Sequence, residues 1–197
     1  MFVRDPSRWH QRGGTLIEVL VAVVIAAIGI MALVGVNAAS LRYAKISEYR
    51  ATATQLATDI AERMRANRAA AVLGNYQLVN LDWADQTAAN ALSNALAALV
   101  MRCNTVASVC SPADLANEDL YTWRESVRDV LPSGSVFLNW IGDEGVPQTD
   151  AYDLWVAWRD PALANTDERA RAVNECPDGL SLGGDAAVRC IYFRINL

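Results

Sequence analysis

The sequence is poor in the residues that many enzymes and metal sites use. Its 197 residues include one histidine, His10, and one lysine, Lys45. A single histidine excludes metal sites with several histidine ligands and most histidine-based catalytic triads. Proline is absent between Pro6 and Pro112, so proline breaks no helix in that stretch. The sequence has no nucleophile elbow, phosphate loop or zinc motif, and we expect neither a cofactor nor a metal.

The composition is apolar and acidic. Apolar residues make up 53% of the chain, and the formal net charge is −5. This content is too apolar for a disordered chain. A net negative charge argues against nucleic acid as the main partner.

One long apolar segment near the N-terminus determines the class of protein. Residues 19–36 carry no charge, and Glu18 is the only ionisable residue from 15 to 36. About 20 apolar residues in a helix span a bilayer. Basic residues precede the segment, which favours a cytoplasmic N-terminus and a head on the far side of the membrane. The run continues without a break into a second helical pattern, so an uncleaved membrane helix is favoured over a secretory signal peptide.

Glu18 is unusual because a carboxylate in lipid is costly, by roughly 2.5–3.5 kcal/mol at the bilayer centre. Two interpretations are open. Glu18 lies at the membrane interface, helped by the positive end of the helix, or it pairs with a cation inside the apolar layer.

Residues 13–22 read GGTLIEVLVA and resemble the prepilin signature G-F-T-L-I-E-V-L-V-A. Gly14 stands where that family usually has Phe. The resemblance implies that a membrane aspartyl protease cuts between Gly13 and Gly14 and methylates the new amine. It also implies that Glu18, the fifth mature residue, pairs with the N-terminal amine of a neighbouring subunit.

The helical pattern continues past the apolar segment to about Asn67. Apolar residues recur there at spacings of four and three: Tyr49, Ala53, Leu56, Ile60 and Met64. Residues 56–68 are also similar to the A-x-D-x-A-E/D-R-M-R-A-N-R segment that ends the long helix of PilV-type minor pilins. The alternative is an ordinary basic last turn that complements the helix dipole through Arg63, Arg65 and Arg68.

The remaining sequence predicts two further helices and three strands. A helix is expected over 82–102, and Ser111 caps another that runs to about Val130. That second helix should bury Leu115, Leu120, Trp123 and Val127. Alternation then predicts strands over 136–141, 152–159 and 191–197, in an antiparallel sheet on the second half of the long helix, and most tryptophans in the core. The order Trp123, Val127, Leu131-Pro132, Gly134 and the strand 156–158 also resemble the PilV group. The predicted fold class is α+β, type IV pilin-like.

Four cysteines, all in the second half, suit two disulfides in an oxidising compartment. Of three connectivities, the sequence-local pairs are favoured: Cys103–Cys110 and Cys176–Cys190. Four free thiols or a metal site are less favoured. Gly142-Asp143-Glu144-Gly145, with Asp150 and Asp153 nearby, suggests calcium but lacks the twelve-residue ligand order. An acidic hairpin explains it more simply.

The resemblance implies a division into a leader (1–13), a membrane half-helix (14–37) and a periplasmic head (38–197). It implies a structural protein, not an enzyme: a minor pilin that primes type IV pilus growth from the inner membrane and ends at the pilus tip. Its partners would be the prepilin peptidase, other minor pilins, the major pilin, a tip adhesin and the inner-membrane assembly platform. The first alternative is a minor pseudopilin of a type II secretion system. The second is a periplasmic enzyme or binding module on a plain membrane anchor.

Overall fold

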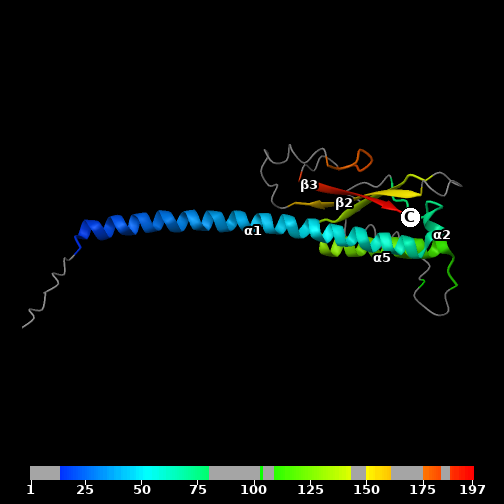
Figure 1. Cartoon of the computed structure of the whole chain (residues 1–197), viewed down its shortest axis with the longest axis horizontal. Helices are drawn as coiled ribbons and strands as arrows, with labels where there is room; N and C mark the ends of the chain where they lie inside the picture. The colour runs from blue at the N-terminus through cyan, green and yellow to red at the C-terminus, as the bar shows by residue number, and fades with distance from the viewer. Residues whose placement is uncertain (1–13, 80–102, 104–108, 143–149, 161–174, 183–186) are drawn as a thin grey trace, which may run out of the picture. The chain divides into compact units, whose positions relative to one another are not determined.

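A computed structural model describes residues 14–79, 103, 109–142, 150–160, 175–182 and 187–197 (Figure 1). The chain divides into two compact units, Met1–Ala44 and Lys45–Leu197. The helix expected over 82–102 lies outside the described residues. The described elements are α1 (Leu16–Ala66), α2 (Arg68–Ala71), α5 (Pro112–Val130), β1 (Ser135–Trp140), β2 (Ala151–Arg159) and β3 (Val188–Asn196). They confirm the predicted α+β, pilin-like fold class.

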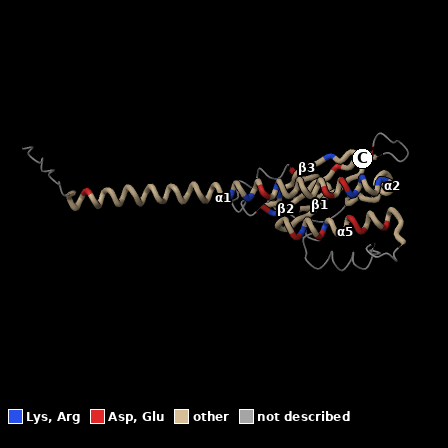
Figure 2. Tube along the Cα trace, turned by 60° about the horizontal axis from the view of Figure 1, so that its bottom comes forward, with Lys and Arg blue, Asp and Glu red and all other residues tan. Residues whose placement is uncertain are grey.

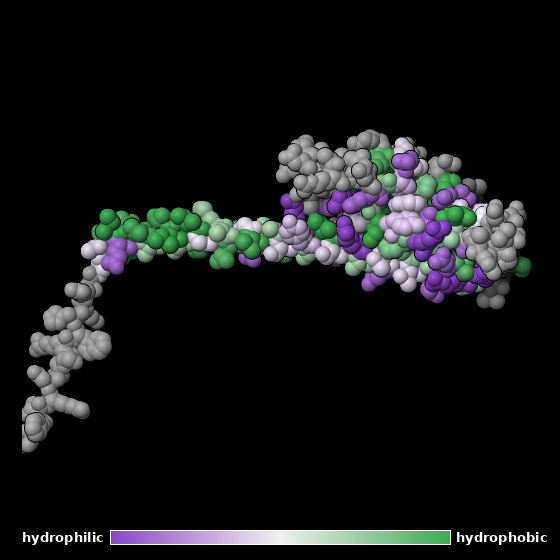
Figure 3. Space-filling view, turned by 45° about the horizontal axis from the view of Figure 1, so that its top comes forward, coloured by the Kyte–Doolittle hydropathy of each residue, from purple (hydrophilic) through white to green (hydrophobic). Residues whose placement is uncertain are grey.

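Helix α1 has 51 residues, which confirms the predicted helix over 15–67. Its first part exposes its apolar side chains, from Leu16 (80% exposed) to Val36 (63% exposed), and Figure 3 shows this part in green. Charged residues are concentrated beyond it, after a single acidic residue near its beginning (Figure 2). An exposed apolar surface of this length is typical of a segment that contacts lipid or other apolar protein surfaces.

The second part of α1 packs in the core of the head. Ala53, Ile60 and Met64 are fully buried, Leu56 is 9% exposed, and Tyr49 packs on the same core in a partly buried position. These are the residues of the predicted stripe. They share one hydrophobic cluster with α5 and with the inner face of the sheet, so the predicted packing of the sheet on α1 is confirmed.

Helix α5 begins as the sequence predicts. Ser111 is its N-cap, Pro112 occupies the first turn, and Ser111 and Asp114 form a reciprocal capping box. Leu120, Trp123 and Val127 are buried, but the prediction that Leu115 is buried is wrong, because it is 40% exposed. A separation of five residues from Leu120 turns Leu115 about 140° away from the buried stripe.

The three strands form one antiparallel sheet in the order β1-β2-β3, and each lies within three residues of its predicted range. Trp158 is buried on the inner face and Trp123 is buried on α5, whereas Trp140 and Trp155 are partly buried. The tryptophan prediction is thus confirmed for two of the four described. Gly74, at φ +77°, lies in the middle of the turn after α2, and a Cβ there would lie 2.8 Å from Trp140 Cε3.

The outer face of the sheet carries a second, smaller cluster. It consists of Phe137, Ala157, Leu180, Val188 and Cys190, with Cys176 and Leu182 among its partly buried neighbours. Residues 175–182 therefore cover part of this face. Gly179 is necessary there, because a Cβ would lie 2.8 Å from the ring of Phe137.

Candidate processing site and the polar cluster of the head

The candidate processing site lies at the start of α1. Gly13 is outside the described residues, whereas Gly14 and Thr15 are exposed and precede the helix. Glu18 lies in the first turn, where its N–H donates to the carbonyl of Thr15 over 2.9 Å. A Cβ on Gly14 would lie 3.5 Å from Glu18 Oε2. The carboxylate thus turns back toward the residue that would carry a new amine after cleavage.

The segment that follows Glu18 is long and apolar enough to cross a membrane, judged by length and composition. An 18-residue window of α1 has a mean hydropathy of 3.0, and none of that window is buried. Glu18 is therefore a single carboxylate at the beginning of an exposed apolar helix. Such a group near a helix N-terminus is favoured by the helix dipole, and lipid or a protein bundle would favour a cation beside it.

Comparison with known families finds this same segment. The family model of the prokaryotic N-terminal methylation motif matches residues 10–34. The match supports a type IV pilin-like prepilin. A pilin-type motif points to a structural protein rather than an enzyme, and it implies processing by a prepilin peptidase and assembly with other pilins. No curated protein and no solved structure matches the chain.

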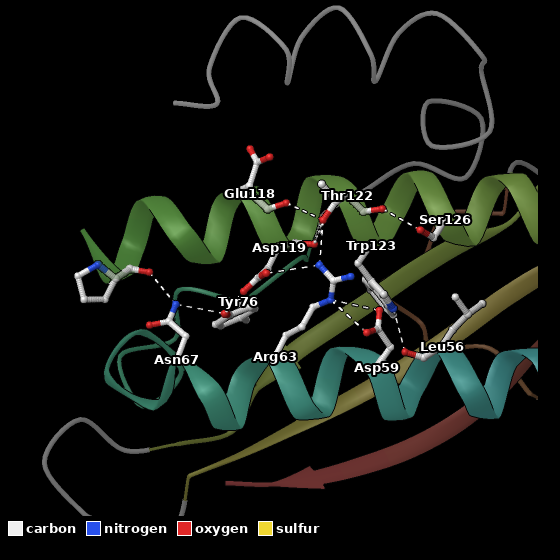
Figure 4. Close-up of polar contacts among 11 residues, drawn as sticks. Leu56, Asp59, Arg63, Asn67, Tyr76, Glu118, Asp119, Thr122, Trp123 and Ser126 are labelled. Carbon is white, nitrogen blue, oxygen red and sulfur yellow. Dashed lines mark hydrogen bonds and ion pairs between the residues drawn. The ribbon is translucent and has the colours of Figure 1, made fainter. Parts of the chain in front are cut away.

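A cluster of polar side chains, which we call the polar cluster, joins the end of α1 to α5 (Figure 4). It consists of Asp59, Arg63, Asn67, Tyr76, Asp119 and Thr122. Its members come from three segments that lie far apart in the sequence. It holds the two helices together where the long helix of the head ends.

Tyr76 is the centre of the polar cluster. It is fully buried, and its hydroxyl donates to Asp119 Oδ2 over 2.6 Å. Asn67 Nδ2 donates to the same hydroxyl over 3.2 Å and to the carbonyl of Pro112 over 2.8 Å. Burial, followed by the hydrogen bond to Asp119, raises the pKa of Tyr76. The phenol therefore remains a neutral donor to the carboxylate.

Arg63 completes the polar cluster on the exposed side. Its Nε lies 3.2 Å from both carboxylate oxygens of Asp59, and its Nη1 donates to Thr122 Oγ1 over 3.0 Å. Nη1 also reaches Asp119 Oδ1 at 3.4 Å. Partial burial lowers the pKa of Arg63, but the bonds to Asp59 and Asp119 outweigh it and raise the pKa. The guanidinium thus bridges the two helices as a charged group.

The sequence indicated only part of this arrangement. The interpretation of the basic turn as a complement to the helix dipole does not include the contacts of Arg63 with α5. Exposed Arg65 pairs with Glu62 at 2.6 Å. Arg68 lies 4.0 Å from Asp150. Tyr76 and Asp119 were missed, because 43 residues separate them and neither belongs to a local pattern.

The structure contains two disulfides. Cys103 is bonded to Cys110, and Cys176 is bonded to Cys190. Both are the sequence-local pairs that the sequence favours. The second one ties residues 175–182 to β3 within the smaller cluster on the outer face of the sheet.

The candidate calcium loop lies mainly outside the described residues, which omit 143–149. Asp150 contacts Arg68, and Asp153 accepts a 2.6 Å hydrogen bond from the Tyr192 hydroxyl. Within the described ranges, no group of three or more histidine, cysteine or acidic residues is placed to hold a metal.

Proposed function

We propose that the chain is a minor pilin of the PilV type. In this proposal residues 1–13 are a leader that the prepilin peptidase removes, residues 14–37 lie in the inner membrane and then in the filament, and residues 38–197 form a periplasmic head. The protein helps to prime a type IV pilus and remains in a complex of minor pilins at its tip, beside the major pilin and a tip adhesin. Growth proceeds from the inner-membrane assembly platform.

The observation that carries this proposal is the position of Glu18 within the methylation motif. The motif covers residues 10–34, and Glu18 lies in the first turn of an exposed apolar helix. Cleavage before Gly14 creates a cation in the same layer. An amine and a carboxylate on neighbouring subunits neutralise each other in an apolar bundle, which sets the register between the helices.

The head supports the pilus side of the proposal. A helix that packs against a small antiparallel sheet suits the globular head of a pilin. The basic segment that resembles PilV proteins contributes Arg63 and Asn67 to the polar cluster. These residues would preserve the shape of the head that neighbouring minor pilins contact.

Substitutions of glutamates on α1 test the assembly role. Glu18→Ala should insert into the membrane normally but fail to appear in sheared pili. The matched control is Glu48→Ala, which removes an exposed carboxylate paired with Lys45 at 2.7 Å and should leave incorporation unchanged. Normal incorporation of Glu18→Ala would contradict the proposal and would favour an enzyme or binding module on a plain anchor.

Gene deletion distinguishes pilus from pseudopilus. A minor pseudopilin of a type II secretion system shares the methylation motif, so the motif does not separate the two. Loss of the protein should abolish twitching motility and leave exoprotein secretion intact. Loss of secretion with normal twitching would instead assign the chain to the secretion system.

A further inference from the structure

The two edges of the sheet differ. At the β1 edge, the N–H of Leu78 donates to the carbonyl of Leu138 over 2.7 Å, and Leu138 returns the bond over 2.9 Å. Strand β3 forms the other edge. In the described ranges, no strand pairs with the outer side of β3.

Hydrogen bonds at both ends of β3 establish which backbone groups point outward. Beyond one end, Leu197 N–H donates to the carbonyl of Asp150, and beyond the other, Asp160 N–H donates to the carbonyl of Ala187. Residues of an antiparallel strand alternate between bonding one neighbour and bonding the other. The odd-numbered residues therefore bond to β2. The even-numbered residues direct N–H and C=O away from it, and in the second half of β3 these are Tyr192, Arg194 and Asn196.

Judged from the described residues, only the second half of this edge is open. Tyr192 is 47% exposed, the side chain of Arg194 is 52% exposed, and Asn196 is exposed as well. In the first half, Val188 and Cys190 are buried. The outward amides of residues 192–196 thus form a short open edge, which we call the β3 edge.

We propose that the β3 edge binds an extended segment of a partner protein as a fourth strand. The added strand would accept hydrogen bonds from the outward N–H groups and donate to the outward carbonyls, as in other cases of strand addition. This inference depends on the sheet alone and does not require the proposed function.

The side chains along the β3 edge define the chemistry of this partner. Arg194 Nε lies 3.8 Å from Asp153, and half of its side chain faces solvent, so an acidic residue opposite Arg194 is favoured. Phe193 points to the opposite face and packs, partly buried, on the core. An apolar residue of the partner next to Phe193 would bury the part of this side chain that is still exposed. The partner segment therefore places an acidic residue opposite Arg194 and apolar residues next to that acidic residue.

A second copy of the chain fits this edge poorly. Antiparallel self-pairing centred on residue 194 sets Arg194 opposite Arg194, and like charges in that position are unfavourable. Centring on Tyr192 or on Phe193 sets Arg194 or Asn196, respectively, opposite Cys190, which is buried and disulfide-bonded. Centring on Ile195 leaves only Arg194 and Asn196 to pair with each other. A different protein is therefore the better occupant.

Amide hydrogen exchange of the full-length chain in detergent micelles tests the proposal. The probe is a synthetic peptide with the sequence of β2, residues 151–159, because β2 already pairs with β3 and sets Asp153 opposite Arg194. With the peptide at about ten times its Kd, exchange at Tyr192, Arg194 and Asn196 should slow about tenfold. The amides of Phe193 and Ile195 should not change. No slowing, or equal slowing at all five amides, would overturn the proposal.

Two controls separate backbone pairing from adhesion by side chains. The same peptide with alternate amides N-methylated should not slow exchange. In the protein, Arg194→Pro removes an outward N–H that β2 does not use and should abolish binding, whereas Arg194→Ala should retain the alternating pattern. Equal binding by both variants would contradict strand addition. If Arg194→Pro melts at a lower temperature, the comparison of the unmodified and the N-methylated peptide on the wild-type chain decides whether strand addition occurs. That result does not depend on whether the chain enters pili.

Discussion

Removal of the Tyr76 hydroxyl should destabilise the head more than its size suggests. In Tyr76→Phe, Asp119 loses a 2.6 Å donor and Asn67 loses an acceptor; Tyr76 and Asn67 are buried and Asp119 is partly buried. A hydrogen bond to a charged group contributes about 1.5–3 kcal/mol. Asp119 still contacts Arg63, and Asn67 still bonds to Pro112, so we expect a loss of about 2 kcal/mol. For a chain of this size, that loss corresponds to a melting temperature lower by about 4–8 °C.

Urea unfolding of the full-length chain in micelles, followed by tryptophan fluorescence, measures this loss. The matched control is Tyr192→Phe, which also removes a 2.6 Å hydrogen bond to a carboxylate, from Asp153, but at a residue that is 47% exposed. It should cost less than about 0.5 kcal/mol. Equal losses for the two variants would show that burial of the Tyr76 hydrogen bond adds nothing to the stability of the head. A double-mutant cycle with Asp119→Asn should also give a coupling energy above about 1 kcal/mol.

The pH dependence of this contribution follows from the raised pKa of Tyr76. A group whose pKa is higher in the folded state stabilises that state fully below its unfolded value and loses this contribution as pH rises. The advantage of the wild type over Tyr76→Phe should therefore be constant near neutrality and should shrink above pH 10.0, the ordinary tyrosine value. An advantage that grows above that pH would contradict the assignment of the neutral phenol as donor.

Three further predictions concern the head. Gly74→Ala should lose about 2 kcal/mol or more, because φ is +77° and the indole beneath leaves no room for Cβ; Gly35→Ala, with nothing within 4 Å, should not destabilise the head in the same urea assay. Ser111→Ala should cost about 1 kcal/mol. The hydrogen bonds from Ser111 also lower the pKa of Asp114, so the cost of Ser111→Ala should decrease as pH falls below about 3.8, the ordinary aspartate value. A cost that does not change with pH would contradict the capping box. Joint replacement of Cys176 and Cys190 by alanine should cost about 3 kcal/mol, for a separation of 14 residues, and an unchanged urea midpoint would show that this disulfide does not stabilise the head.

Local patterns predicted the elements of this fold well. The 4-3-4-4 spacing from Tyr49 to Met64 identified the buried face of α1, and Ser111 with Pro112 identified the start of α5. Both patterns arise from interactions between residues that lie only a few positions apart in the sequence. The prediction that Leu115 is buried was wrong because apolar character alone does not indicate on which side of a helix a residue lies.

Long-range polar contacts were not predictable in the same way. Tyr76 meets Asp119 because a turn after α2 and the start of α5 converge on the end of α1. No local spacing indicates such a convergence. The open edge of β3 likewise depends on the order of the strands, which alternation within each strand does not determine.

In the proposed function, a protease creates the cation that Glu18 requires. Intact mass measurement and N-terminal sequencing of the native protein test it most directly, because they identify the first residue of the mature chain. We expect a mature chain that begins at Gly14, so that Glu18 is its fifth residue. A native protein that retains residues 1–13 and still assembles would contradict a role for the new amine in pairing with Glu18.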